Sequence, residues 1–361
     1  METKRIQIGK DIGGLTREEE AGLWQAAEIL RKGGLVAFPT ETVYGLGGDA
    51  LNPQSSRKIY EAKGRPSDNP LIIHISRFGD ICKIVKELPE TAVRIADAFW
   101  PGPLTMILPK ADIVPHETTG GLDTVAVRFP SHPVAQKLIA YSGGYIAAPS
   151  ANASGRPSPT AAKYVLEDMD GRIDMIVDGG EVGIGLESTI IDLTVEPPRI
   201  LRPGYVTQEM LDRVLEKVDI DVTIIEPDCG QAPKAPGMKY RHYAPKGRLV
   251  IVEGAPEQVV SYINRQAEED RRKGEKTGVI GTTEVLEQYQ ADVVKCIGNR
   301  QAEEEIARNL FAILRELDDE KVMSIYSESF SAEGLGQAIM NRLLKAAGHK
   351  IVRLSADGAS G

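Results

Sequence analysis

A short segment of this sequence places two cations next to residues that disfavour regular structure. Lys63 and Arg65 stand one residue apart in a Lys-Gly-Arg-Pro segment, and an apolar, β-branched run at 71–75 follows shortly after. Arginine offers a planar fork of donors and lysine a compact point charge, so this loop suits a polyanion such as a chain of phosphates. Taken alone, the segment is equally consistent with a polar surface turn whose charges are only solvated.

Hydroxyl and amide side chains gather where other apolar runs begin or end. Residues 35–38 predict a buried strand that stops at Pro-Thr-Glu-Thr, and residues 145–148 predict one that opens into Pro-Ser-Ala-Asn. In open α/β sheets ligands collect at strand ends, although ordinary hydroxyl-rich turns remain the alternative. The polar side chains collected in this way are Thr40, Thr42, Lys63, Arg65, Asn69, His74, Arg128, Ser150, Asn152, Ser158, Ser188 and Arg202.

This set consists mainly of cations, hydroxyls and amides, and it includes no Ser or Cys paired with a base in a recognisable nucleophile motif. Such groups position phosphates and a small polar substrate, and they do not indicate a covalent enzyme intermediate. The histidines are scattered and the three cysteines lie far apart, so no metal ligand is assigned to any protein side chain.

The composition limits the class of protein and its surroundings. A chain of 361 residues is long enough for two domains, and its net charge of -9 disfavours a surface that grips nucleic acid throughout. No apolar run is long enough to cross a bilayer, and the first residues lack the apolar core of a signal peptide. Sparse, unpaired cysteines suit a reducing compartment, so we expect a cytoplasmic protein with no membrane association.

The elements that would hold these side chains form two α/β regions. Residues 1–225 predict the first, which opens on a helix begun by a Thr16/Glu19 capping box. Residues 248–350 alternate strands and helices regularly, which predicts a smaller parallel sheet covered by helices. Between them, 226–247 is a Pro- and Gly-rich linker, and 351–361 is read as a tail.

Four spaced motifs of the first region resemble one known family. They are Pro-Thr-Glu-Thr-Val-Tyr-Gly-Leu at 39–46, Lys-Gly-Arg-Pro at 63–66, Pro-Ser-Ala-Asn at 149–152 and Glu-Ser-Thr at 187–189. They look like the YrdC-like domain of L-threonylcarbamoyl-AMP synthases. The linker motif at 236–245 and the α/β region after it look like the long, two-domain form of these enzymes.

The resemblance implies a fold and an activity. It implies an N-terminal YrdC-like twisted α/β sheet with a basic cavity, followed by a smaller Rossmann-like α/β domain. The implied reaction converts L-threonine, bicarbonate and ATP into L-threonylcarbamoyl-AMP and pyrophosphate, with magnesium accompanying ATP. The product would pass to a separate transferase complex that completes N6-threonylcarbamoyladenosine at position 37 of tRNAs reading ANN codons.

Roles for individual residues follow from joining this reaction to the side chains above. Lys63 and Arg65 are expected to act on the phosphates as the catalytic cations. The expected ATP-binding residues are Lys63, Arg65, Asn69, Thr124, Ser150, Asn152, Ser158, Arg202 and Tyr243. The expected threonine-binding residues are Thr40, Thr42, His74, Arg128, Ala148 and Ser188, with Arg128 facing the carboxylate and His74 either moving a proton or only positioning the substrate.

The linker is expected to act as a lid, because a reactive adenylate would hydrolyse in open water. Its aromatic residues Tyr240, His242 and Tyr243 are the expected strap over the active site. Two other functions remain open: a module whose basic cleft binds RNA, at least weakly, and transfer of a carbamoyl group during metalloenzyme maturation. The acidic net charge disfavours the first, and the absence of zinc-finger cysteines disfavours the second.

Overall fold

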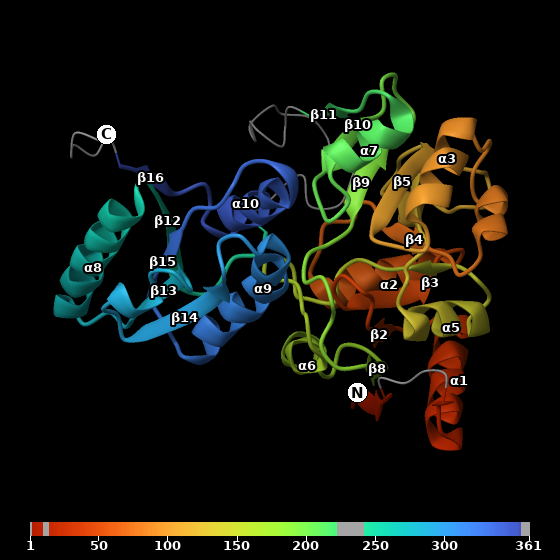
Figure 1. The fold of residues 1–361 in the computed structure, drawn as a ribbon. Coiled ribbons are helices and arrows are strands. Elements are labelled where there is room, and N and C mark those ends of the chain that lie inside the picture. Colours follow the sequence, from red (N-terminus) through yellow and green to blue (C-terminus); the bar gives the residue numbers. More distant parts are fainter. Residues whose placement is uncertain (1, 10–13, 222–241, 355–361) are drawn as a thin grey trace. The chain divides into compact units, whose positions relative to one another are not determined.

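The structure is a computed structural model that describes residues 2–9, 14–221 and 242–354 (Figure 1). Most of the predicted linker, including Tyr240, lies outside these described residues. Among the described residues, no helix is both long enough and apolar enough to cross a membrane.

The chain divides into two compact units. The first unit consists of Met1–Ser154 and Ser158–Tyr240, and the second of Gly155–Pro157 and Arg241–Gly361. The boundary at residue 240 falls within the predicted linker. No feature of the sequence indicates that three residues of the loop after the Pro-Ser-Ala-Asn motif belong to the second unit.

The first unit is built on an 11-stranded mixed sheet with the order β1-β8-β2-β3-β7-β4-β6-β5-β9-β10-β11. Its strands are β1 (Lys4–Gln7), β2 (Val36–Phe38), β3 (Gly45–Asp49), β4 (Ile72–His74), β5 (Leu104–Pro109), β6 (Thr124–Arg128), β7 (Ile146–Ala147), β8 (Met175–Asp178), β9 (Thr189–Asp192), β10 (Arg199–Arg202) and β11 (Asp219–Ile220). Its helices are α1 (Arg17–Arg31), α2 (Pro53–Lys63), α3 (Glu90–Phe99), α4 (His116–Thr119), α5 (Pro133–Tyr141), α6 (Ala162–Met169) and α7 (Gln208–Leu215), with a 3₁₀ turn at Phe78–Lys83.

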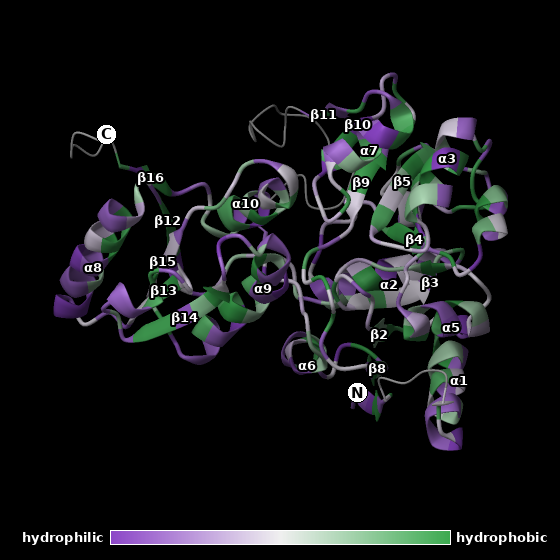
Figure 2. Ribbon diagram, viewed as in Figure 1, coloured by the Kyte–Doolittle hydropathy of each residue, from purple (hydrophilic) through white to green (hydrophobic). Residues whose placement is uncertain are grey.

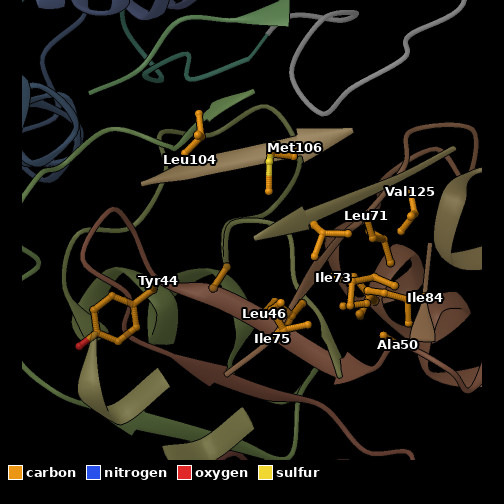
Figure 3. Packing of buried hydrophobic residues seen from close by; sticks show 14 of the residues in the cluster. Tyr44, Leu46, Ala50, Leu71, Ile73, Ile75, Ile84, Leu104, Met106 and Val125 are labelled. Carbon is orange, nitrogen blue, oxygen red and sulfur yellow. The ribbon is translucent and has the colours of Figure 1, made fainter. Parts of the chain in front are cut away.

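Apolar side chains on both faces of this sheet explain the continuous apolar runs of its strands. Along β2, Ala37 joins one buried cluster whereas Val36 and Phe38 join another, because successive side chains of a strand point to opposite faces. Figure 3 shows part of the first cluster, which includes Leu46 of β3 and Ile73 of β4. Strands buried on both faces place their polar side chains where the strands end.

Helix α1 covers one of these faces and begins as the sequence predicts. The Thr16 hydroxyl accepts a hydrogen bond from the Glu19 backbone N–H at 3.2 Å. The Glu19 carboxylate accepts one from the Thr16 backbone N–H at 2.7 Å, which confirms the capping box. The helix packs against α5, where Trp24 and Tyr141 stack with ring centroids 4.1 Å apart. Its alternating apolar and polar stripes are visible in Figure 2.

Helix α2 corrects the expectation that both cations lie in a loop. It begins at Pro53, after the N-cap Asn52, and ends at Lys63. The residue after it, Gly64, has a φ of 61°, a conformation that glycine adopts readily. Lys63 is therefore the last residue of the helix, and only Arg65 lies in the loop. A cation in the last turn of a helix is also favoured by the helix dipole.

The second unit contains a parallel sheet of five strands in the order β14-β13-β15-β12-β16. Its strands are β12 (Arg248–Glu253), β13 (Thr277–Thr282), β14 (Val293–Gly298), β15 (Ser324–Glu328) and β16 (Ile351–Arg353). Its helices are α8 (Pro256–Arg272), α9 (Glu303–Asp319) and α10 (Gly334–Ala346), with a 3₁₀ turn at Leu286–Gln288. Figure 1 shows α8 on one face and α9 and α10 on the other, which confirms the predicted sheet covered by helices.

Two details of the second unit differ from the sequence-based expectation. Ile351–Arg353 were predicted as the start of a tail. In the structure they form the edge strand β16, which pairs in parallel with β12. Residues Gly155–Pro157 are held by α9, since the fully buried Arg315 donates to the Pro157 carbonyl at 2.6 Å and Arg156 pairs with Asp318 at 3.4 Å. The second unit thus includes part of a loop whose neighbouring residues belong to the first.

Candidate functional site

A buried arginine stands at the centre of the polar side chains in the first unit. Arg128 ends β6, lies only 4% exposed and donates from Nη1 to the Thr42 hydroxyl at 2.9 Å. The Thr42 hydroxyl lies 2.8 Å from that of Thr40, in the turn that follows β2. The structure therefore brings together three residues that the sequence placed at the ends of two separate strands.

The same group extends across the sheet through β5. Thr105 pairs with Arg128 in the register of β5 and β6, and its hydroxyl lies 2.8 Å from that of Ser188. Arg202, at the end of β10, donates to the Ser188 hydroxyl at 3.1 Å and to its carbonyl at 3.0 Å. We call Thr40, Thr42, Thr105, Arg128, Ser188 and Arg202 the hydroxyl–arginine cluster. Arg202, expected at the phosphates, contacts residues expected to bind threonine.

The guanidinium of Arg128 also faces a carboxylate. Glu41 lies between the two threonines of the turn, and its Oε1 is 2.8 Å from Nη2 of Arg128. Burial is the largest influence and raises the pKa of Glu41, but the Arg128 charge, the hydrogen bond from Arg128 and the backbone N–H groups of Glu41 and Ser131 together hold the pKa below its usual value. The cluster thus contains a buried, oppositely charged pair.

His74 lies beside Arg128 as a neutral group. It ends β4, pairs with Arg128 in the register of β4 and β6, and its Nδ1 lies 3.1 Å from the Ile72 carbonyl. Burial, reinforced by the Arg128 charge, lowers the pKa of His74 to about 3. A group that binds a proton so weakly is a poor proton acceptor near neutral pH, so the geometry favours a positioning role for His74.

Lys63 holds a second group of predicted residues together. Its ammonium, buried at the end of α2, donates to the Asn152 carbonyl at 2.5 Å and to the Ser150 carbonyl. The Ser150 hydroxyl donates to Oδ1 of Asn152 at 2.5 Å. We call Lys63, Ser150 and Asn152 the lysine–loop cluster, in which one cation fixes the backbone of the Pro-Ser-Ala-Asn loop.

The loop after α2 is braced by its own arginine. Arg65 donates to the carbonyls of Asn69 at 3.3 Å and Pro70 at 3.2 Å. Asn69 is 1% exposed, and among the described residues its Oδ1 has no hydrogen-bond partner. A buried amide oxygen of this kind can accept a hydrogen bond from a ligand.

Backbone hydrogen bonds join these groups to one another. The Leu46 amide donates to the Pro149 carbonyl at 2.8 Å, and Gly45 bridges to Ser150, so the Pro-Ser-Ala-Asn loop lies against the segment that follows Thr42. The Ser158 hydroxyl donates to Glu187 at 2.5 Å, directly beside Ser188. The motifs predicted to form one site are therefore neighbours in the first unit.

Three other predicted residues have more peripheral or separate places. Thr124 begins β6, roughly 13 Å along the strand from Arg128 at about 3.3 Å per residue. Ala148 is buried, and its amide donates to the Ile72 carbonyl at 2.9 Å. Tyr243 belongs to the second unit, where its ring packs 5.0 Å from that of Phe311.

Among the described residues, no three His, Cys, Asp or Glu side chains are grouped so that they could hold a metal ion. The described part of the site instead offers buried arginines, a lysine, hydroxyls and main-chain groups. Such a set suits an anionic or zwitterionic organic ligand that carries its own counter-ion.

Comparisons with known proteins identify the family to which this chain is similar. A family described as "Telomere recombination" (Sua5, YciO and YrdC) matches residues 28–204, and one described as "Threonylcarbamoyl-AMP synthase, C-terminal domain" matches residues 206–348. The threonylcarbamoyl-AMP synthase of Pyrococcus abyssi is 50% identical, with 94% of this chain and 97% of the relative covered. The chain belongs to the threonylcarbamoyl-AMP synthase family. The synthase of Bacillus subtilis is 47% identical, with 98% of this chain and 100% of the relative covered.

A solved structure of the same family has a similar fold. The crystal structure of P. abyssi Sua5 complexed with L-threonine is 48% identical, with a TM-score of 0.91, and the match covers 98% of this chain and 100% of that chain. This match, together with the two family models that cover residues 28–204 and 206–348, confirms the predicted long, two-domain form of the synthase family.

Sequence reasoning missed three residues that the structure places at the site. Thr105 carried a usable signal, because it is a polar residue within an otherwise apolar strand. Glu41 and Glu187 stood inside recognised motifs, but carboxylates have no evident use in a site predicted to bind phosphates. Their partners, Arg128 and Ser158, could be identified only from the folded chain.

Proposed function

We propose that the two clusters of the first unit form the active site of a threonylcarbamoyl-AMP synthase. The enzyme makes L-threonylcarbamoyl-AMP and pyrophosphate from L-threonine, bicarbonate and ATP, the first step of N6-threonylcarbamoyladenosine formation in tRNA. The observation that carries this assignment is the buried hydroxyl–arginine cluster, which offers Arg128 and several hydroxyls to a small amino acid.

The reaction sets the requirements that the site must meet. Threonine's ammonium and bicarbonate combine into a carbamate, releasing water and one proton. A carbamate oxygen then attacks the α-phosphorus of ATP, and the bond from that phosphorus to the bridging oxygen of pyrophosphate breaks. Because one anion approaches another, cations must offset their repulsion and stabilise the departing pyrophosphate.

Threonine is assigned to the hydroxyl–arginine cluster. A guanidinium can form paired, charge-assisted hydrogen bonds with a carboxylate, so Arg128 would hold the α-carboxylate. Thr40, Thr42 and Ser188 would surround the rest of the substrate, while neutral His74 and Ala148 would form walls beside it. Arg202, which contacts Ser188, would stand between this substrate and the phosphates.

ATP is assigned to the lysine–loop cluster and the loop that follows α2. Lys63 and Arg65 supply positive charge, while Ser150, Asn152 and Asn69 supply hydrogen-bonding groups. Ser158 and Thr124 complete the proposed nucleotide site. Magnesium would arrive with the phosphates, because Mg²⁺ commonly binds through phosphate oxygens and retained waters, without a cage of protein ligands.

The product is a reactive mixed anhydride that must leave without hydrolysis. We assign its protection to the linker strap and its use to a separate transferase complex that modifies tRNA. Of the proposed strap, His242 and Tyr243 are described, whereas Tyr240 lies outside the described residues. Cytoplasmic location and any weak RNA binding remain predictions.

The decisive experiment measures pyrophosphate release together with mass-spectrometric detection of threonylcarbamoyl-AMP. Both should require threonine, bicarbonate and ATP, and neither should form when any one is left out. Lys63→Met should raise the KM for ATP about 10- to 100-fold, whereas Ser188→Ala should chiefly raise the KM for threonine. Nucleotide turnover that is independent of threonine would refute the function, and RNA binding alone predicts no dependence on either small substrate.

A further inference from the structure

The carboxylate of Glu41 is an unused charge at the centre of the proposed threonine site. Its side chain is 13% exposed, that of Arg128 is 5% exposed, and the two charged groups are 2.8 Å apart. The pair joins the turn after β2 to the end of β6.

Around this ion pair, several charged atoms lack the side-chain hydrogen bonds that usually accompany buried charges. Within the described residues, no side chain meets either carboxylate oxygen of Glu41 with good hydrogen-bond geometry, and Nε and Nη2 of Arg128 also have no partner of good geometry. The other donors near the Glu41 carboxylate are the backbone N–H groups of Glu41 and Ser131. Taking two charges out of water costs several kcal/mol per ion unless good geometry and further hydrogen bonds compensate. Native proteins leave few buried polar groups in this state, and those that remain call for an explanation such as a binding role.

The missing partners define the chemistry of a ligand. Arg128 requires an acceptor, which a carboxylate supplies as a planar pair of oxygens. Glu41 requires a donor, which an ammonium supplies with three N–H bonds. An α-amino acid carries both groups on one carbon atom, so its zwitterion matches an arginine and a glutamate that lie side by side.

No other group described around Arg128 supplies the negative charge that an ammonium group requires. His74 is neutral near physiological pH, and its Nδ1 faces the Ile72 carbonyl. Burial lowers the pKa of the nearby His132, which disfavours a second positive charge there. Thr42 already accepts a hydrogen bond from Arg128 through its hydroxyl, so it cannot replace a full negative charge.

We propose that Glu41 binds the ammonium group of the substrate whose carboxylate is bound by Arg128, so that the pair selects zwitterionic α-amino acids. In the absence of substrate, the two side chains neutralise each other. When an amino acid enters, each exchanges its partner for the oppositely charged group of the ligand, and the total charge of the site is unchanged. The proposal rests on the proposed function, which places threonine at Arg128.

Calorimetric titration of the full chain without ATP tests this with two ligands of matched shape. One is L-threonine, and the other is 2,3-dihydroxybutanoate of the same configuration, in which a hydroxyl replaces the ammonium. Wild-type protein should bind threonine about 10- to 100-fold more tightly, the range expected when a charged hydrogen bond is lost. Equal affinity of the wild-type protein for the two ligands would overturn the proposal without the need for any variant.

The Glu41→Gln variant separates ammonium binding from support of Arg128. It should weaken threonine binding about 10- to 100-fold and leave binding of dihydroxybutanoate unchanged or tighter, because Arg128 is then free of a competing carboxylate. Equal losses for both ligands, or no loss for threonine, would contradict a role in ammonium binding. Glu20→Gln is the matched control, since Glu20 is an ion-paired glutamate of the same unit with partners Lys137 and Tyr141 outside the site.

The wild-type result also distinguishes this proposal from the function on which it rests. If wild-type protein shows no threonine binding and no threonine-dependent release of pyrophosphate, the proposed function itself fails. If it shows both, but threonine and dihydroxybutanoate bind alike, the function stands and only the role of Glu41 is rejected.

Discussion

Two arginine–glutamate pairs, one in each unit, show how differently the same chemistry can be used. In the first unit, Arg128 and Glu41 are both largely buried, and both Glu41 oxygens together with Nε and Nη2 of Arg128 lack side-chain hydrogen bonds of good geometry. In the second unit, Glu328 is 3% exposed and pairs with Arg300. The residues alone do not distinguish the two pairs.

The surroundings of Glu328 supply what those of Glu41 lack. The Glu328 carboxylate accepts a hydrogen bond from the Thr282 backbone N–H at 2.7 Å and another from the Thr282 hydroxyl at 3.1 Å. Arg300 donates further to the Ser329 carbonyl at 2.9 Å. This network ties β13, β15 and the loop after β14 together, so its charges are already satisfied without a ligand.

The contrast indicates which buried charges belong to the architecture and which to a binding site. A fully hydrogen-bonded pair holds neighbouring elements in one arrangement. A buried pair with open hydrogen-bonding positions stays costly until a ligand fills them. On this reasoning the first unit carries the substrate chemistry, and the charges around Glu328 support the fold of the second.

The largest expected effect comes from removing the positive member of the first pair. Arg128→Gln should lower kcat/KM for threonine about 10²- to 10³-fold, because the substrate carboxylate loses a charged, buried partner. It should also destabilise the protein by about 3–5 kcal/mol, because Glu41 is then buried without a counter-charge. Steady-state kinetics and denaturant unfolding measure the two effects.

The double variant Arg128→Gln with Glu41→Gln separates stability from activity. Neutralising both members should recover much of the lost stability, since no isolated charge is buried, while turnover stays low. If the double variant regained turnover as well, the pair would be structural like that around Glu328, and the contrast between the units would disappear.

How much of this contrast could be foreseen depends on the range of the contacts involved. The capping box at Thr16 follows from neighbouring residues, and the sequence predicts it. The left-handed Gly64 after α2 is also a local feature, although Lys63 was expected in the loop and is in fact the last residue of the helix. The gathering of polar loops at strand ends follows from apolar runs buried on both faces of a sheet. These local rules suggested most of the residues that are proposed here for the site.

The remaining features depend on contacts between distant residues. Arg128 meets Glu41 only because the mixed sheet brings the end of β6 beside the turn after β2. Lys63 was expected in a loop facing phosphates, but its ammonium first secures the Ser150 and Asn152 carbonyls. No periodicity or local motif encodes which backbone carbonyl a lysine will reach.

A smaller effect is expected from the second pair, and it should fall on stability alone. Glu328→Gln should lower the free energy of unfolding by about 1–2 kcal/mol, because its charge-assisted hydrogen bonds become neutral ones while Arg300, itself partly exposed, keeps some water. Threonine-dependent turnover at 25 °C should change less than about twofold, as for substitutions that leave substrate contacts intact. Unfolding should be followed in the full chain with denaturant. A marked fall in turnover with unchanged stability would mean that the second unit also contributes charge to the reaction.

The smallest expected change in free energy concerns Tyr243, the described tyrosine of the proposed strap. Its ring is 5% exposed and packs against Phe311, so Tyr243→Ala would remove packing as well as the hydroxyl. Tyr243→Phe keeps the ring and removes only the hydroxyl, and it should reduce turnover about three- to tenfold if that hydroxyl contributes one hydrogen bond to the nucleotide or the closed lid. The lifetime of threonylcarbamoyl-AMP, followed by mass spectrometry, should shorten in the same variant. Unchanged turnover and lifetime in Tyr243→Phe, with loss of stability only in Tyr243→Ala, would make Tyr243 a packing residue of the second unit and confine the reaction's polar contacts to the first.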